Sequence, residues 1–153
     1  MPEDIPKLLI VDASILFSFF KKGSGRRIII EELYEFGCKL ISPAFAFKEL
    51  ADNKERVKKY GKVNELAFAF IFSLLDRKVE SFPEEEYNGF LPEANKISPH
   101  GEQTEDDPYF ALALALSCAI WSDEVAFKQQ SRIKVFTTKE LSGLLKKSKS
   151  ESK

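Results

Sequence analysis

The sequence predicts an α/β fold, a three-layer α/β/α sandwich with a central parallel sheet of four to five strands. Short apolar runs, such as KLLIVDAS at 7–14, alternate with segments of helical spacing, and this alternation is typical of a parallel sheet covered by helices. The segment 107–119 is apolar all round, as in a helix buried on both sides. With 153 residues, 44% of them hydrophobic, we expect one domain over 1–146 and a disordered tail over 147–153.

The first half of the chain is predicted to contain three strands and four helices. The expected strands, all short apolar runs, are residues 7–14, 38–42 and 78–82. The expected helices are residues 15–22, 27–37, 43–60 and 63–77. Gly37 and Gly61 fit helix C-termini, while Ser42 fits an N-cap and Pro43 the first position of a helix.

The second half begins with residues 83–106, which are rich in acids and proline and show no periodicity. We expect a loop there, with one helical turn near 83–87, and a loop that long inside a small domain is usually functional. The elements expected after it are helix 107–119, strand 119–122, a helical turn over 124–130, strand 132–138 and helix 139–147.

Charge and cysteine content limit the possible partners. Lys and Arg total 23 against 24 Asp and Glu, so contact with nucleic acid would need a local basic patch. Cys38 and Cys118 lie in apolar surroundings, which indicates buried thiols in a reducing compartment. The N-terminus does not resemble a signal peptide. The apolar run 109–121 is shorter than the roughly 20 residues that span a bilayer, so we expect a soluble cytoplasmic protein without membrane contact.

Five acids are predicted to meet at one edge of the sheet. The C-terminal ends of parallel strands and the N-terminal ends of the following helices share that edge, which is where open α/β sheets bind ligands. Asp12 ends the first strand, Glu49 lies in an early turn of the helix after the second strand, and Asp107 begins the apolar helix. Asp123 and Glu124 follow the next strand.

Clustered carboxylates repel one another, and a hard divalent cation removes that conflict. Oxygen ligands favour Mg²⁺ or Mn²⁺, and a chain whose single histidine is His100 is a poor candidate for zinc. Metals held by acids commonly generate hydroxide for displacement at phosphorus. Each acid also has a structural interpretation: Asp12 and Asp106 or Asp107 as helix caps, and Glu49 as a solvated helix residue.

Four segments in order, LLIVDASILFSFF, SPAFAFKELADN, DPYFALALAL and IWSDEVAFKQQ followed by KVFTT, resemble the PIN-domain family of metal-dependent ribonucleases. The resemblance implies a PIN-like fold, Mg²⁺ or Mn²⁺ as cofactor, and RNA as substrate. It maps the catalytic acids onto Asp12, Glu49, Asp107 and an acid after the fourth strand, with Ser14 supporting Asp12. The DxxxALA pattern favours Asp107 over Asp106 and Glu105.

The last acid departs from the family pattern. That pattern has Ser or Thr, a variable residue, Asp, and Phe three positions on. Ser122 and Phe127 place Glu124 in the acid position and Asp123 in the variable one. We therefore expect Glu124 as the catalytic acid and count Asp123 as an alternative metal ligand, with Ser122 supporting the site.

RNA contact is expected from local basic segments, of which 21–27, 54–62 and 146–153 are candidates. Each Lys or Arg that neutralises a phosphate adds salt-sensitive affinity. The second segment is favoured because it belongs to the predicted helix of Glu49 and contains an aromatic ring that could stack on a base. The RNA-binding residues predicted there are Lys54, Arg56, Lys58, Lys59 and Tyr60.

The favoured function is a metal-dependent endoribonuclease, either a toxin with a protein antitoxin as inhibitor or an RNA-processing enzyme. The alternative is a catalytically weak relative that binds RNA or protein as a scaffold. A phospho-receiver domain is disfavoured because KVESFPEEE offers no Asp after the third strand. The all-apolar helix and the family resemblance predict a homodimer.

Overall fold

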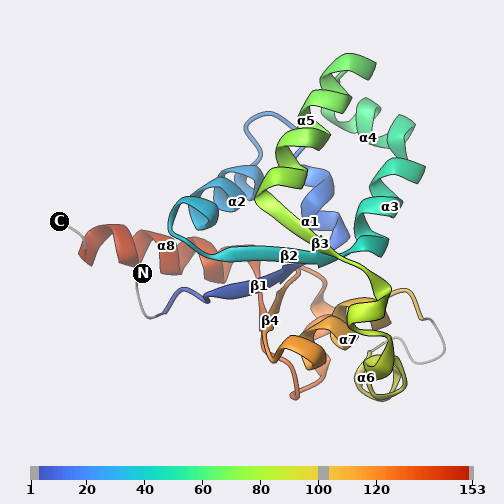
Figure 1. The fold of residues 1–153 in the computed structure, drawn as a ribbon. Helices are drawn as coiled ribbons and strands as arrows, with labels where there is room; N and C mark the ends of the chain where they lie inside the picture. The colour runs from blue at the N-terminus through green and yellow to red at the C-terminus, as the bar shows by residue number, and fades with distance from the viewer. Residues whose placement is uncertain (1–3, 100–103, 152–153) are drawn as a thin grey trace.

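The computed structural model describes residues 4–99 and 104–151. Its centre is a five-stranded, all-parallel sheet in the order β3-β2-β1-β4-β5. Helices α1, α2, α3 and α5 lie on one side of the sheet, with α4 packed on α3 and α5, and α6 and α7 lie on the other side (Figure 1). The predicted three-layer α/β sandwich is therefore confirmed. The strands are β1 (Leu8–Val11), β2 (Lys39–Pro43), β3 (Val79–Phe82), β4 (Ala119–Trp121) and β5 (Val135–Phe136).

The α-helices of the described residues are α1 (Ala13–Ser18), α2 (Gly25–Glu35), α3 (Ala44–Asp52), α4 (Lys54–Gly61), α5 (Glu65–Lys78), α6 (Leu91–Ile97), α7 (Asp107–Leu116) and α8 (Thr138–Glu151). Three short 3₁₀ segments join them: η1 (Glu84–Glu86), η2 (Asn88–Phe90) and η3 (Val125–Gln129). No helix in 4–99 or 104–151 is long and apolar enough to span a bilayer.

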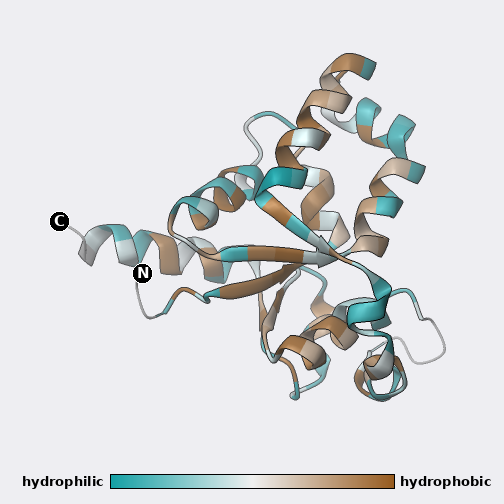
Figure 2. Ribbon diagram, viewed as in Figure 1, coloured by the Kyte–Doolittle hydropathy of each residue, from teal (hydrophilic) through white to brown (hydrophobic). Residues whose placement is uncertain are grey.

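The core lies on both faces of the central strands. Leu9, Ile10 and Val11 of β1 are fully buried, because β1 pairs with β2 on one side and β4 on the other. Apolar residues concentrate in the strands and in α7 (Figure 2). Phe110, in the first turn of α7, is also fully buried. This packing fixes the strand ends, and hence the positions of the polar residues that follow them.

Pro43 and Ser42 have other roles than those predicted. Strand β2 continues to Pro43, which pairs with Phe82 of β3, and Pro43 is the N-cap of α3. The Ser42 side chain is buried and donates a hydrogen bond of 2.7 Å to the Val11 carbonyl. The prediction of Ser42 as N-cap was wrong because one more residue of β2 is held by its neighbouring strand.

The predicted helix over 43–60 is two helices, α3 and α4. The break lies at Asn53, whose backbone (φ −105°, ψ 25°) is not helical. Its side-chain amide donates to the Glu49 carbonyl at 2.8 Å, and such local side-chain bonds compete with the regular helix. As a result α4 runs in a different direction from α3 (Figure 1).

The segment 83–106 was predicted as a loop with one helical turn near 83–87. Its described residues contain that turn as η1, and also η2 and α6, which the prediction lacked. Helix α6 packs on α7 and buries Ala94. This contact explains the apolar surface of α7, whose first turns are buried while Leu114 to Leu116 are half-buried. Helix α7 ends at Leu116, short of the predicted 119, because Ser117 adopts a left-handed conformation (φ 52°).

The C-terminal residues are more ordered than predicted. Helix α8 continues to Glu151, where we expected a disordered tail from residue 147. Ser148 is buried, Lys147 pairs with Asp4 at 3.0 Å, and Lys149 pairs with Glu32 of α2. These contacts with α2 and the N-terminal segment hold the last turns of the helix in place.

Candidate active site

Asp12 is the best-supported side chain at the C-terminal edge of the sheet. It caps the N-terminus of α1 and is 7% exposed. Its Oδ2 accepts hydrogen bonds from the hydroxyls of Ser122, at 2.8 Å, and Ser14, at 3.2 Å. Burial raises the pKa of Asp12, and the bonds from the two serines oppose that rise. Both serines that the sequence indicated as supporting residues thus contact the first acid.

The sheet itself brings Ser122 to Asp12. The Asp12 amide donates to the Trp121 carbonyl at 3.1 Å, and the Ser122 amide donates to the Phe136 carbonyl at the same distance. These bonds extend the β1–β4 and β4–β5 ladders by one residue. Two side chains 110 residues apart in sequence are therefore neighbours at the edge of the sheet.

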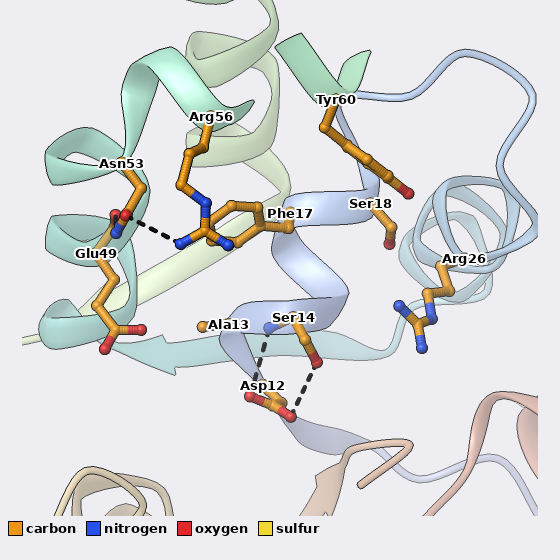
Figure 3. Close-up of a pocket in the computed structure, with 10 residues that line it drawn as sticks. All are labelled: Asp12, Ala13, Ser14, Phe17, Ser18, Arg26, Glu49, Asn53, Arg56 and Tyr60. Carbon is orange, nitrogen blue, oxygen red and sulfur yellow. Dashed lines mark hydrogen bonds between the residues drawn. The ribbon is translucent and has the colours of Figure 1, made fainter. Parts of the chain in front are cut away.

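Asp12 and Glu49 line the same cavity, which has a volume of about 560 Å³. Ser14 lies beside Asp12, and Glu49 comes from α3 on one side (Figure 3). The upper walls include Arg56 and Tyr60 of α4. The break at Asn53 matters here because it directs α4, with these two residues, over the acids.

The pKa of Glu49 is raised, first by burial and then by the negative charges of Asp12, Glu105 and Asp106. Burial, followed by the charges of Asp12 and Glu49, holds the pKa of Tyr109 well above its usual value. These effects place acids from the ends of β1, α3 and the segment before α7 in one region of negative potential. Of the five acids predicted to meet, these effects connect Asp12 and Glu49. The other contributors to the raised pKa of Glu49, Glu105 and Asp106, are the acids over which the sequence favoured Asp107.

Asp107 is less directly connected to Asp12. It is 5% exposed, and its Oδ2 accepts a hydrogen bond of 2.9 Å from Asn95 of α6. It lines a separate pocket of about 420 Å³ together with Glu105 and Tyr87. Its other oxygen, Oδ1, is buried without a hydrogen-bond partner, so half of the carboxylate is left unsatisfied in the described structure.

Asp123 and Glu124 point to different surroundings. Asp123 accepts hydrogen bonds from the Thr138 amide (2.7 Å) and hydroxyl and pairs with Arg26, whose terminal nitrogen lies 2.8 Å away. Burial has the largest single effect on the pKa of Asp123, upward, but the combined bonds from Thr138 and Arg26 lower it. Glu124 is exposed, and its amide donates to the Ser122 hydroxyl at 3.1 Å. Asp123 is therefore engaged in a structural pair, which argues against the metal role considered for it.

The acidic side chains near Asp12 suit a hard divalent cation, because such ions prefer carboxylate oxygens as ligands. The unsatisfied Oδ1 of Asp107 and the raised pKa of Glu49 are conflicts that a cation would relieve. Among residues 4–99 and 104–151, however, no three Asp, Glu, His or Cys side chains are close enough to hold one ion. The residues fit a metal site in chemistry, and they would have to move closer together to coordinate it. His100 lies outside the described residues.

The predicted RNA-binding segment divides into two groups. Arg56 and Tyr60 line the cavity. Lys54 pairs with Glu65, and Lys58 lies 3.0 Å from the same glutamate, so both lysines are directed toward α5. Lys59 is exposed.

Arg26 is a cavity residue that was not singled out from the sequence. It belongs to the basic segment 21–27, but the sequence offered no reason to prefer it over its neighbours. Ser24 caps α2 by accepting from the Arg27 amide at 3.1 Å, and this cap fixes the turn that presents Arg26. The structure identifies it through its contact with Asp123.

The fold and the site together define a class: an α/β protein whose acidic residues follow the strands of a parallel sheet and meet at one edge of it. A family model described as PIN domain matches residues 10–146, so the chain belongs to the PIN-domain family, and the resemblance stated above is confirmed. No curated protein matches the sequence.

Among solved structures, the chain is similar to one in the crystal structure of VapBC2 from Rickettsia felis bound to a DNA fragment from its promoter. The TM-score is 0.67 at 11% sequence identity, and the match covers 85% of this chain and 98% of the other. At that identity the likeness establishes the fold. It confirms the PIN-like arrangement of sheet and helices.

Proposed function

We propose that this PIN-domain protein is a metal-dependent endoribonuclease that hydrolyses RNA phosphodiester bonds. The observation that supports this most directly is the buried Asp12, held by Ser14 and Ser122 and facing Glu49 in one cavity. Burial and mutual repulsion of carboxylates oppose folding, and acids held together despite this are typical of functional sites. Membership of the PIN-domain family supports the same reaction class.

Mg²⁺ or Mn²⁺ is the proposed cofactor, with Asp12, Glu49, Asp107 and Glu124 as the acids that would hold it. When bound, such an ion supplies an activated water and neutralises charge that develops at phosphorus. In this chain Ser14 and Ser122 fix the orientation of Asp12. Burial, followed by the charges of Asp12, Glu105 and Asp106, raises the pKa of Glu49, and a bound cation would favour its ionised form.

RNA is the proposed substrate, held near the acids by side chains of α4. Arg56 can bind a phosphate, and Tyr60, which is 45% exposed, can stack on a base. Lys54, Lys58 and Lys59 add positive charge farther out on the same helix. The two lysines paired with Glu65 would contribute less than the sequence suggested, because their charge is already compensated.

Two protein partners are also proposed. The similar chain comes from a structure named VapBC2, and a toxin-type role with a protein antitoxin as inhibitor is therefore one form of the proposal. A homodimer is the second. The apolar helix α7 that suggested a dimer is covered within the chain by α6, so we now place the self-contact on α5, where Leu66 and Phe70 are 81% and 65% exposed.

A scaffold that binds RNA without cleaving it is the second candidate function. It is favoured by the exposed Glu124 in the position of the last acid and by the spacing of the acids, among which no described trio could hold an ion as placed. Both candidates share the basic and aromatic residues of α4. They differ in whether the acids bind a metal.

Calorimetric Mn²⁺ titration and cleavage of a labelled single-stranded RNA separate the two candidates. The wild-type chain should bind Mn²⁺ and cleave, and Asp12→Asn should lose both. Asp76→Asn, an exposed change of the same kind on α5, is the matched control and should retain both. RNA binding without Mn²⁺ binding or cleavage in the wild type would reject the nuclease and favour the scaffold.

A further inference from the structure

Arg26 stands on one wall of the cavity that contains Asp12 and Glu49. Its side chain is 34% exposed, and its Nε and one terminal nitrogen contact the same oxygen of Asp123, at 3.0 and 2.8 Å. A guanidinium has five N–H donors in a planar fork. The pair with Asp123 therefore leaves donors available on the side of the group that lines the cavity.

Arg56 approaches the same cavity from another element. It belongs to α4, and its contact with Asn53 is long, at 3.5 Å. In Figure 3 the two arginines lie on either side of the start of α1, with Asp12 and Ser14 below and between them. Neither guanidinium forms an ion pair with Asp12 or Glu49 among the contacts of the described residues. Arg26 shares its charge with Asp123 and contributes through its remaining N–H donors.

An anionic chain entering this cavity meets two carboxylates at the floor and a guanidinium on each wall. The carboxylates repel phosphate, and attraction must come from the walls. Arginine matches phosphate oxygens with two parallel N–H bonds, which a lysine cannot do. The two guanidiniums lie on either side of the acids (Figure 3), so each can contact a different phosphate of one chain.

Asp123 is fixed independently of Arg26. Its bonds to the amide and hydroxyl of Thr138 hold it at the start of α8. It thus gives Arg26 a rigid support from a different part of the fold. Of the two adjacent acids after β4, Asp123 would then position the Arg26 guanidinium.

We propose that Arg26 is a phosphate-binding residue, oriented by Asp123, which acts with Arg56 to hold the RNA backbone on both sides of the phosphodiester above Asp12. This inference rests on the proposed function only in taking RNA as the ligand. Binding by the arginines requires neither metal nor cleavage. It also assigns Asp123 as a positioning residue rather than a metal ligand.

The test measures binding of a fluorescein-labelled, single-stranded RNA of about 12 nucleotides by anisotropy, in EDTA and at several salt concentrations. Arg26→Gln should weaken binding about tenfold at 0.1 M salt and reduce the salt slope by about 0.7, as expected for one lost phosphate contact on a single strand. Arg132→Gln is the matched control, because Arg132 is exposed and ion-paired with Glu93. Equal affinities and slopes for the two variants would overturn the phosphate contact.

Two further variants test how Arg26 is held. Asp123→Asn removes a negative charge, and on charge alone it should tighten RNA binding, whereas loss of positioning should weaken it several-fold. Arg26→Lys retains the charge without the fork and should also weaken binding. Tighter binding by Asp123→Asn, or wild-type binding by Arg26→Lys, would reject the positioning role. Thermal unfolding identifies any variant that fails to fold. If Asp123→Asn does not fold, Arg26→Lys still tests how Arg26 is positioned.

Failure of this inference is distinguishable from failure of the proposed function. If the wild type cleaves RNA with Mn²⁺ while Arg26→Gln and Arg132→Gln have the same KM, the arginine contact fails and the nuclease stands. If Arg26→Gln loses RNA binding in a chain that never cleaves, the contact stands and the nuclease fails. Mn²⁺ affinity unchanged by Asp123→Asn supports the positioning role, and a large loss of affinity makes Asp123 a ligand and rejects it.

Discussion

Replacement of Ser122 by alanine tests the geometry on which the site depends. The Ser122 hydroxyl donates to Asp12 at 2.8 Å and accepts from the Glu124 amide at 3.1 Å. The variant removes both contacts without adding volume. Glu124 is exposed, so water can replace the second contact. The loss therefore falls mainly on Asp12, which is 7% exposed and keeps only the longer bond of 3.2 Å from the Ser14 hydroxyl at that oxygen.

A hydrogen bond to a charged group contributes about 1.5–3 kcal/mol, so we expect Ser122→Ala to lower the free energy of unfolding by about 2 kcal/mol at neutral pH. For a domain of this size, that loss corresponds to a decrease in Tm of about 4–8 °C. The pKa of Asp12 should rise further in the variant, because the Ser122 bond favours the ionised carboxylate.

The sign of the pH dependence follows from that bond. The Ser122 contact favours the ionised form of Asp12, so its contribution is present above the folded-state pKa and decreases as the pH falls through it. Burial acts in the opposite direction and leaves the pKa of Asp12 raised overall. The difference in Tm between wild type and variant should therefore be greatest at neutral pH and shrink on acidification.

Urea unfolding and a double-mutant cycle measure this effect. Ser122→Ala is made in the wild-type and Asp12→Asn backgrounds, and the coupling energy isolates the contact between the two side chains. Ser73→Ala, at an exposed position of α5, is the control and should change stability by less than about 0.5 kcal/mol. A coupling energy near zero, or a destabilisation that does not change with pH, would refute the reasoning.

Three other changes test separate features. Gly61→Ala should destabilise the fold by about 1–3 kcal/mol, since its Cβ would lie 2.3 Å from the Phe20 carbonyl oxygen; Gly143→Ala, with open space in the middle of α8, should stabilise by about 0.5–1 kcal/mol, and chemical denaturation compares the two. Asp12→Asn should raise Tm at neutral pH without metal, because the raised pKa of Asp12 means that its ionisation opposes folding. This gain in Tm should vanish below the unfolded-state pKa, where Asp12 is protonated in both the folded and the unfolded chain. Scanning calorimetry across pH measures the gain, and a gain that grew on acidification would contradict the prediction. Phe70→Glu should shift a homodimer to monomer in sedimentation velocity, and a wild-type chain that is already monomeric would reject the self-contact on α5.

The sequence was sufficient for the sheet and for the first acid. Strands β1, β2 and β4 are short apolar runs, and such side chains are stable only when they are buried in the core. Their positions in the sequence could therefore be predicted. Parallel strands place their C-terminal ends at one edge, and this rule alone predicted that Asp12 would meet residues more than a hundred positions away. The contact with Ser122 is its clearest result.

The elements that sequence patterns missed depend on contacts between distant residues. Helix α6 has no strong apolar spacing of its own, and it is held in place by packing on α7. The break between α3 and α4 arises from one side-chain bond of Asn53, which propensity does not distinguish from an exposed asparagine within a helix. The length of α8 follows from pairs made with Asp4 and Glu32.

The orientation of a carboxylate is harder to predict than its position, and the acids of this site show why. Asp107 begins α7 and Asp123 follows β4. Each is directed by a polar partner that no local pattern reveals: Asn95 for Asp107, and Thr138 and Arg26 for Asp123. A carboxylate rotates toward the donors that satisfy it, and those donors come from other elements. One oxygen of Asp107 has no such donor. A cation would satisfy that oxygen, whereas Asp123 already has its donors, so Mn²⁺ binding should depend on Asp107 and not on Asp123.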